Sequence, residues 1–214
     1  MSHENNETAL NATRGMLVAL EATAEALVNI PSDRVIADIQ RVACNLGCKS
    51  FNGFATTPEL EQRYYDRFFI PTSPYFIPLS ESRITDAADI QGSLTFGPPF
   101  GPCTKHAEDC YRQIGFDYSK LVGFDSAIQA LVADSLACEV SFLAFLKKGA
   151  LVDTSQFDLY DRLAAQFISA HDERWIRKAV CLMKATDDDF YARLVDFAAD
   201  LFAIERELYQ KQNR

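Results

Sequence analysis

Three side chains that can bind a metal ion stand close together at Cys103, His106 and Cys110. On a helix, His106 and Cys110 would lie one turn apart on the same face, with Cys103 just before them. Cys44 and Cys48 could add two thiolates. None of these spacings matches the paired Cys-x2-Cys arrangement of common structural zinc sites. We therefore expect the cysteines to bind no metal. The alternative hypothesis is a metal or iron–sulfur-binding redox protein that uses these five side chains.

Enzyme signatures are missing from the rest of the chain. A Ser-His-Asp triad has little to draw on, because His106 and His171 are the two histidines away from the N-terminus and no Gly-x-Ser-x-Gly turn is present. A phosphate-binding Gly-x-x-x-x-Gly-Lys loop is also missing, and residues 97–101 are too rich in proline to replace it. We expect a protein that is not an enzyme and that holds no cofactor.

Other polar residues have simpler interpretations. Asp187–Asp189 precede a helix, where acidic side chains favour the positive end of the helix dipole. Glu139 should lie on the flank of an apolar helix, either paired with a cation or forming the acidic wall of a groove. His171 and Trp175 are one helical turn apart and can share a face, which by itself indicates packing.

The composition indicates one compact domain. The chain has 214 residues, 48% of them hydrophobic, enough to bury a sizeable core. Its net charge of -9 comes with scattered basic residues, which argues against nucleic acid as a partner and suits a basic peptide.

The N-terminus has no secretory signal and no stretch is apolar enough to span a membrane, so we expect a cytoplasmic protein with reduced cysteines. Cys138 and Cys181 should pack as small apolar side chains.

Proline and glycine divide the chain into helices. We expect helices at about 8–29, 33–46, 57–69, 104–114, 125–148, 156–184 and from 190 onward, with residues 1–7 frayed. Ser32 and Thr57 are the expected N-caps, and Gly47, Gly115 and Gly149 the expected stops.

Two further features complete the expected fold. Thr186 with Asp189 resembles a capping box before the last helix. Six of the eight prolines lie between Ile70 and Pro102, which predicts a long connection without regular helix between the third and fourth helices. Because no run of alternating apolar residues predicts a strand, the expected class is an all-α, single-domain helical bundle.

Three segments of the chain stand out as a set. Residues 65–71 and 77–82 combine an aromatic run with a Pro-Leu-Ser-Glu-Ser loop, and residues 134–146 open an apolar helix with an aspartate. Residues 167–175 place Phe, His and Trp four positions apart, and Phe190-Tyr191 follows. In this order and at these separations, the segments resemble the TorD/DmsD-like family of cytoplasmic chaperones that mature molybdopterin-containing redox enzymes.

The resemblance implies a function and a site. Members of this family bind the twin-arginine signal peptide or the core of a molybdoenzyme subunit and assist its folding and cofactor insertion. The residues that we expect to contact the client are Tyr65, Phe68, Phe69, Asp134, Ser135, Glu139, His171 and Trp175. The aromatic rings would take the apolar stretch of the peptide, while Asp134 and Glu139 would meet its arginines.

The chain also departs from the family pattern. The family shows Glu-Pro-x-Asp-His where this chain has residues 131–135, so only Asp134 is kept, and Ser80 replaces an aromatic residue. Two alternatives stay open beside the metal-binding hypothesis. One is a regulatory helical bundle that has no client peptide, and the other is a homodimer in which the long connection acts as a domain-swapping hinge.

Overall fold

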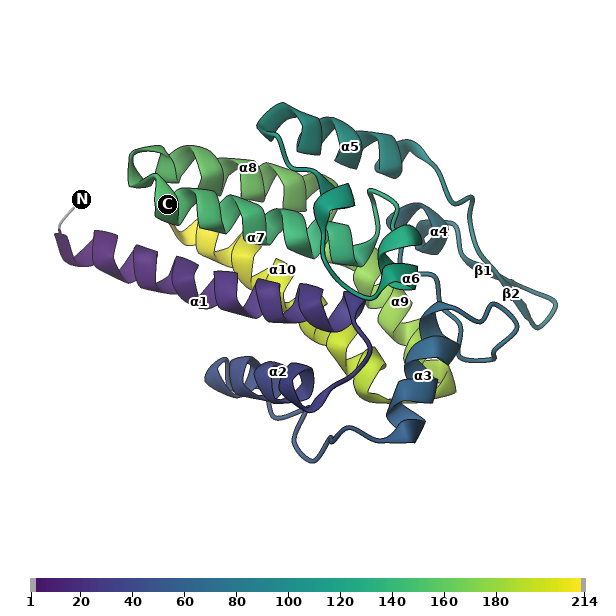
Figure 1. Cartoon of the computed structure of the whole chain (residues 1–214). Coiled ribbons are helices and arrows are strands. Elements are labelled where there is room, and N and C mark those ends of the chain that lie inside the picture. The colour runs from purple at the N-terminus through teal and green to yellow at the C-terminus, as the bar shows by residue number, and fades with distance from the viewer. Residues whose placement is uncertain (1–2, 213–214) are drawn as a thin grey trace.

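The computed structural model describes residues 3–212, and its architecture is the predicted all-α bundle. In chain order the elements are α1 (His3–Val28), α2 (Asp33–Asn45), α3 (Pro58–Phe68), α4 (Glu81–Thr85), β1 (Ala88–Ile90), β2 (Ser93–Thr95), α5 (Pro102–Ile114), the 3-10 turn η1 (Tyr118–Lys120), α6 (Asp125–Gln129), α7 (Leu136–Val152), η2 (Thr154–Gln156), α8 (Phe157–Ala170), α9 (Glu173–Thr186) and α10 (Phe190–Gln212). Figure 1 shows α5 along one side of the bundle and α2 along the opposite side.

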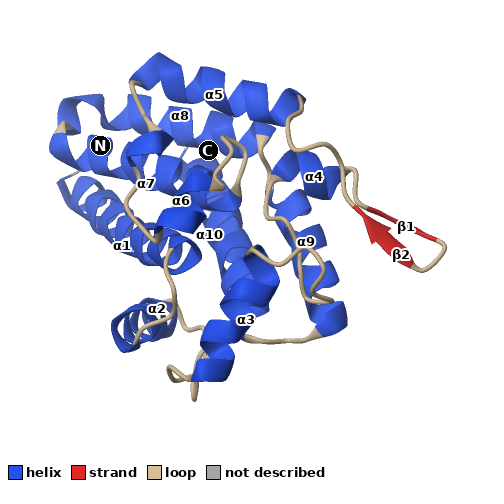
Figure 2. Ribbon diagram, turned by 45° about the vertical axis from the view of Figure 1, so that its right-hand side comes forward, coloured by secondary structure: helices blue, strands red, loops and turns tan. Residues whose placement is uncertain are grey.

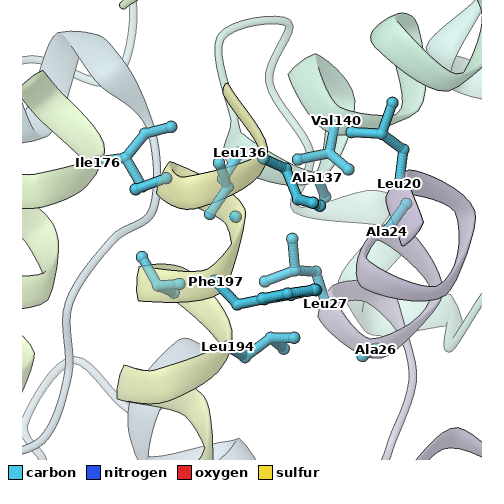
Figure 3. Packing of buried hydrophobic residues seen from close by; sticks show 14 of the residues in the cluster. Leu20, Ala24, Ala26, Leu27, Leu136, Ala137, Val140, Ile176, Leu194 and Phe197 are labelled. Atoms are coloured by element: carbon cyan, nitrogen blue, oxygen red, sulfur yellow. The ribbon is translucent and has the colours of Figure 1, made fainter. Parts of the chain in front are cut away.

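Helix α7 forms the centre of the core. Its sequence is apolar almost all round, which is typical of a helix buried on every side. Leu136 and Val140 of α7 are fully buried and meet Leu20 and Leu27 of α1, and Figure 3 shows these side chains gathered between the two helices and α10. One continuous cluster of buried apolar side chains draws on α1, α2, α7, α8, α9 and α10, so the described chain forms one domain.

Local signals place several helix ends where the sequence predicts them. Ser32 and Thr57 each accept the backbone N–H of the residue three positions on, at 3.3 and 3.2 Å, and so cap α2 and α3. Gly115 follows α5 with a φ of 75°, a left-handed conformation that glycine adopts without strain. Of residues 1–7, for which fraying is predicted, 3–7 belong to α1, and residues 1 and 2 lie outside the described range.

The single helix predicted for residues 125–148 is wrong. The chain forms α6 and α7 instead and leaves helical geometry between them. Two backbone bonds to a distant segment account for the break: Glu81 N–H donates to Asp134 O at 2.9 Å, and Leu136 N–H donates to Leu79 O at 3.0 Å. These bonds satisfy backbone groups that a continuous helix would have paired internally.

Gly149 does not end α7, contrary to the prediction. The helix continues to Val152, and Gly149 instead lies against the ring of Tyr160 on α8. A Cβ atom at position 149 would lie 2.5 Å from that ring. Glycine therefore permits the close approach of α8 to α7.

The helix predicted for residues 156–184 is also two helices. His171 ends α8, and Asp172 caps α9 by accepting the backbone N–H of Arg174 at 3.0 Å. The predicted capping box of the last helix is wrong as well, because Thr186 is the final residue of α9. Asp189 caps α10 through the backbone N–H of Ala192 at 2.9 Å.

The connection between α3 and α5 contains regular structure that the sequence did not predict. Besides α4, it forms an antiparallel hairpin in which Ala88 of β1 pairs with Thr95 of β2, and Figure 2 shows this hairpin projecting from the bundle. Gln91 and Gly92 make its tight turn with φ values of 55° and 81°. The strands are three residues long and exposed, too short to show an alternating pattern.

Two further predictions concern the burial of cysteines. Cys138 is fully buried, as expected, but Cys181 is exposed, because it lies off the α9 face that carries Trp175, Ile176 and Ala179 into the core.

Within residues 3–212, no helix is long and apolar enough to cross a membrane.

Candidate functional site

The break between α6 and α7 is joined to the start of α4. Ser80 and Ser135 pair as an isolated antiparallel bridge, and the carboxylate Oδ2 of Asp134 accepts the backbone N–H of Ser82 at 2.9 Å. Ser80 occupies the N-cap position of α4 but forms no capping bond through its own side chain. Asp134, which is fully buried, therefore caps α4 from another part of the chain.

Glu81 connects this junction to the end of α8. Its carboxylate Oε2 lies 2.5 Å from Nδ1 of His171, and both residues are buried. The other ring nitrogen of His171, Nε2, lies 2.8 Å from Nδ1 of His106 on α5. His106 is exposed, so a chain of polar groups runs from the surface to Glu81. The ring of Phe167 stacks on His171 with centroids 4.5 Å apart and holds the imidazole in place.

Glu139 of α7 faces the same cluster and has no exposed surface. Its Oε1 lies 3.6 Å from His171 Nδ1, and neither of its carboxyl oxygens has a hydrogen-bond partner. Burial raises the pKa of the Glu139 carboxyl well above its usual range, and the carboxylates of Glu81 and Asp134 add to the rise. The indole N–H of Trp175 lies near enough to oppose that rise, although its geometry falls short of a hydrogen bond.

Two cysteines of α5 lie beside this cluster. Burial raises the pKa of the Cys103 thiol to about 12, with further contributions from the carboxylates of Glu81, Asp134 and Glu139. Cys103 is therefore a neutral thiol at pH 7. The sulfur of Cys110 lies 3.9 Å from both ring nitrogens of His106.

An apolar hollow adjoins the Ser80–Ser135 bridge, since Leu79 and Ser135 line it. Its volume is about 110 Å³. Apart from Ser135, every lining residue is apolar; the list is Leu27, Val28, Phe68, Phe69, Ile77, Pro78, Leu79, Ala127, Ala130, Leu131, Ser135 and Ala137. We call it the α3–α7 hollow. Tyr65 stands beside it, because its ring packs against those of Phe69 and Phe124 with centroids 6.2 and 6.1 Å apart.

A second, larger hollow of about 430 Å³ lies between α1 and α7. We call it the α1–α7 hollow. Its floor is apolar, and its rim carries Glu21, Glu25 and Lys148. Val28, the last residue of α1, lines both hollows. Phe124 N–H donates to Val28 O at 2.9 Å, so the chain before α6 contacts the end of α1 where the two hollows meet.

The eight residues predicted to contact a client fall into two groups. Phe68, Phe69 and Ser135 line the α3–α7 hollow and Tyr65 lies next to it. The other four, Asp134, Glu139, His171 and Trp175, lie in the buried cluster, none of them more than 4% exposed. Glu139 is thus not on the flank of its helix, and neither it nor Asp134 faces a surface where arginines could bind.

The five side chains of the alternative metal hypothesis are not brought together. Cys44 and Cys48 lie at the end of α2, and α2 and α5 occupy opposite sides of the bundle in Figures 1 and 2. All six cysteines are free thiols. Within the described part of the chain, the set of three side chains with metal-binding geometry is instead Glu81, Glu139 and His171.

Glu81 is the member of the cluster that sequence reasoning missed. It lies within the Pro-Leu-Ser-Glu-Ser loop, but its partner His171 is 90 positions away. A signal was present, since an acidic residue in the first turn of a helix favours the positive end of the helix dipole. Nothing in that local pattern points to a histidine in α8.

Comparisons with models of protein families, with curated proteins and with solved structures found no match to this chain.

Proposed function

We propose that this protein is a non-enzymatic cytoplasmic chaperone of the TorD/DmsD-like kind. Its client is the catalytic subunit of a molybdopterin-containing oxidoreductase, held through its signal region or its core during folding and cofactor insertion. The proposal rests on the motif resemblance and on one structural observation, the meeting of the three resembling segments at a single place in the fold.

That meeting involves specific contacts. The first and second segments join through the Ser80–Ser135 bridge and line the α3–α7 hollow together. The second and third join through Glu139 and His171, and the first and third through Glu81 and His171. Three segments that are separate in the sequence form one continuous structure, which is expected of residues that share a function.

The α3–α7 hollow suits the apolar stretch of a signal peptide. A preformed apolar surface binds such a stretch by removing its side chains from water, at about 25 cal/mol for each Å² that is buried. Phe68 and Phe69 are only partly buried, so their rings present apolar surface to an incoming segment.

The basic end of the peptide needs an acidic surface nearby. Asp134 and Glu139 are buried, so we assign that role to Glu21 and Glu25 at the rim of the α1–α7 hollow. Glu25 already pairs with Arg34 on α2, an exposed ion pair that a peptide arginine could replace at small cost. A peptide that lies along α1 and passes Val28 would contact both hollows.

Co-purification from the native host tests the proposal. Tagged wild-type protein should retain a molybdoenzyme catalytic subunit, identified by mass spectrometry. Leu131→Asp places a charge in the α3–α7 hollow and should retain at most about a tenth as much, because losing about 1.4 kcal/mol of binding free energy lowers affinity tenfold. Ile90→Asp, at a hairpin residue that is 58% exposed, is the matched control and should behave as wild type.

Two results would oppose the proposal. One is repeated failure to recover any molybdoenzyme subunit while such an enzyme is expressed. The other is equal recovery of the subunit by the wild type and by folded Leu131→Asp protein, which would show that the α3–α7 hollow does not bind the client.

A further inference from the structure

We propose that Glu81, Glu139 and His171 form a binding site for one divalent first-row transition-metal ion, of which Zn²⁺ is the representative. The site lies where α4, α7 and the end of α8 meet, and it is independent of the proposed client. Three features support the site: the geometry of the three ligand atoms, the unpartnered carboxyl oxygens, and the hydrogen bond between His171 and His106.

The ligand atoms are already close enough to share an ion. One oxygen of Glu81, one of Glu139 and Nδ1 of His171 all lie within 4.8 Å of one another. Ligands about 2.1 Å from a metal ion are about 3.4 Å apart at the tetrahedral angle and about 4.2 Å apart when opposite each other. The separation of 3.6 Å between Glu139 Oε1 and His171 Nδ1 fits this range. The contact of 2.5 Å between Glu81 and His171 has to lengthen by about 0.9 Å to reach the tetrahedral separation.

The polar groups of the cluster favour the binding of a cation. Glu139 is fully buried with both carboxyl oxygens unpartnered, and Asp134 Oδ1 is buried and unpartnered as well. Buried polar oxygens normally have a partner, because leaving one unpaired costs about 1–3 kcal/mol. Among the described residues, the ion pairs of Glu81 and Glu139 are with His171 alone, and no lysine or arginine joins them. A divalent ion would balance two carboxylates and give Glu139 its partner.

The second ring nitrogen of His171 has the partner that a metal-bound histidine usually has. Nε2 lies 2.8 Å from His106 Nδ1, so a proton that Nε2 carries and donates to His106 leaves Nδ1 of His171 free to bind metal. Such partners fix the tautomer of a ligating histidine. His106 is exposed and Cys103 is partly exposed, which gives an ion a route from solvent along α5.

The donor set selects the class of metal. One imidazole and two carboxylates suit Zn²⁺ and its first-row neighbours, whereas Mg²⁺ and Ca²⁺ take oxygen ligands. Three protein ligands leave positions for water or for a further group. Cys103, which interacts electrostatically with both glutamates, and Asp134, which interacts electrostatically with Glu139, are candidates for such a group.

Calorimetric titration with ZnSO₄ tests the site. Chelator-treated, full-length protein should bind one equivalent of Zn²⁺, and its melting temperature should rise with the metal concentration. Glu139→Gln keeps the shape of the side chain and removes a ligand, so it should weaken binding by at least tenfold. The substitution should leave the metal-free protein folded, because glutamine has nearly the shape of glutamate and brings no charge into the fully buried position. His106→Ala, a change in a positioning residue, should weaken binding about 10–100-fold.

Two controls identify the ligands. Glu59→Gln changes an exposed glutamate of α3 and should bind Zn²⁺ as wild type does. The double variant Cys44→Ser and Cys48→Ser should also keep the site, because both thiols lie on α2 or just after it. Zinc binding that survives Glu139→Gln, or that disappears in the double cysteine variant, would overturn the proposal.

A measurement on wild-type protein keeps the test valid if Glu139→Gln fails to fold. Nitrogen-15 spectra of the imidazole rings should show one equivalent of Zn²⁺ shifting Nδ1 of the buried histidine. Absence of any zinc binding by the wild type, or a shift confined to other histidines, would also overturn it. The same titration with MgSO₄ should leave the spectrum unchanged.

Discussion

Asp134 Oδ2 accepts the backbone N–H of Ser82 at 2.9 Å, so a residue in the α6–α7 break caps a helix 52 positions earlier in the chain. The backbone carbonyl of Asp134 also accepts the N–H of Glu81, at 2.9 Å. Together these bonds fix the first turn of α4 and carry Glu81 toward His171. They make Asp134 a structural residue in the fold, whatever its relation to a client.

Replacing Asp134 should therefore cost stability. Asp134→Ala leaves the buried N–H of Ser82 without an acceptor and should lower the free energy of unfolding by about 1–3 kcal/mol. Asp134→Asn keeps an acceptor oxygen and should cost clearly less. Urea denaturation in the presence of a chelator measures both, and an alanine variant as stable as wild type would show that the cap contributes nothing.

The fold was predictable where local signals decide it. Ser32 and Thr57 cap their helices through bonds to residues three positions away, and Gly115 stops α5 by its own conformation. The breaks at 130–135 and at His171 were not predictable, because the bonds that stabilise them join segments far apart in sequence. An apolar run interrupted by Asp134 looks like one continuous helix when those partners are not known.

Arg67 is a second buried polar residue whose removal should be costly. Its guanidinium is fully buried and donates to Asp189 Oδ2 at 2.9 Å, to Thr186 Oγ1 at 2.9 Å and to Tyr75 O at 3.1 Å. Lysine has one donor nitrogen and cannot replace this fork of bonds. We expect Arg67→Lys to lower the free energy of unfolding by about 3 kcal/mol.

The neighbouring Arg63 supplies the control for this prediction. Arg63 also pairs with Asp189, but its side chain is 21% exposed. Arg63→Lys should cost less than about 1 kcal/mol, as partly exposed ion pairs usually do. Urea denaturation measures the free energy of unfolding of both variants. Equal decreases in the two would show that the buried hydrogen bonds of Arg67 stabilise the fold no more than the partly exposed ion pair of Arg63 does.

Lys147 of α7 should give a stability change that depends on pH. It donates to Asp161 at 2.9 Å and pairs with Glu205, all three side chains being at most 10% exposed. Burial lowers the pKa of Lys147, but the two carboxylates outweigh it and raise that pKa overall. Burial raises the pKa of Glu205 by more than Lys147 lowers it, and the neighbouring carboxylate of Asp161 adds to the rise.

Lys147→Met leaves the two carboxylates without a cation and should lower the free energy of unfolding at pH 7 by about 3–5 kcal/mol. A carboxyl whose folded-state pKa is raised contributes stability that is full below its unfolded pKa and is lost as the pH rises through its folded pKa. The deficit should therefore shrink between pH 7 and pH 4.5, as Glu205 takes up a proton. Lys148→Met, at the exposed next position, should change little at either pH, and a Lys147→Met deficit that grows on acidification would contradict the assignment.

The site was predictable only in part. Phe68, Phe69 and Ser135 do line one hollow, and it was the family resemblance that grouped the two phenylalanines with Ser135, which lies far from them in the sequence. The carboxylates were assigned to the wrong environment. Glu139 was predicted on the flank of a helix and Asp134 at the start of that helix, both facing a peptide, whereas α7 is buried on nearly every side and both residues are fully buried. Whether a helix is central or peripheral depends on how many other helices surround it, and the pattern along one helix does not contain that information.

Photo-crosslinking in the native host tests the central claim, that the α3–α7 hollow binds a molybdoenzyme client. A photoreactive phenylalanine analogue replaces Phe69, which lines the hollow, and in a parallel strain it replaces Phe100, which is 69% exposed and does not line it. We predict a crosslink from position 69 to the N-terminal segment or the core of a molybdoenzyme catalytic subunit, and none to that subunit from position 100. No crosslink to such a subunit, or equal crosslinking from both positions, would contradict the claim.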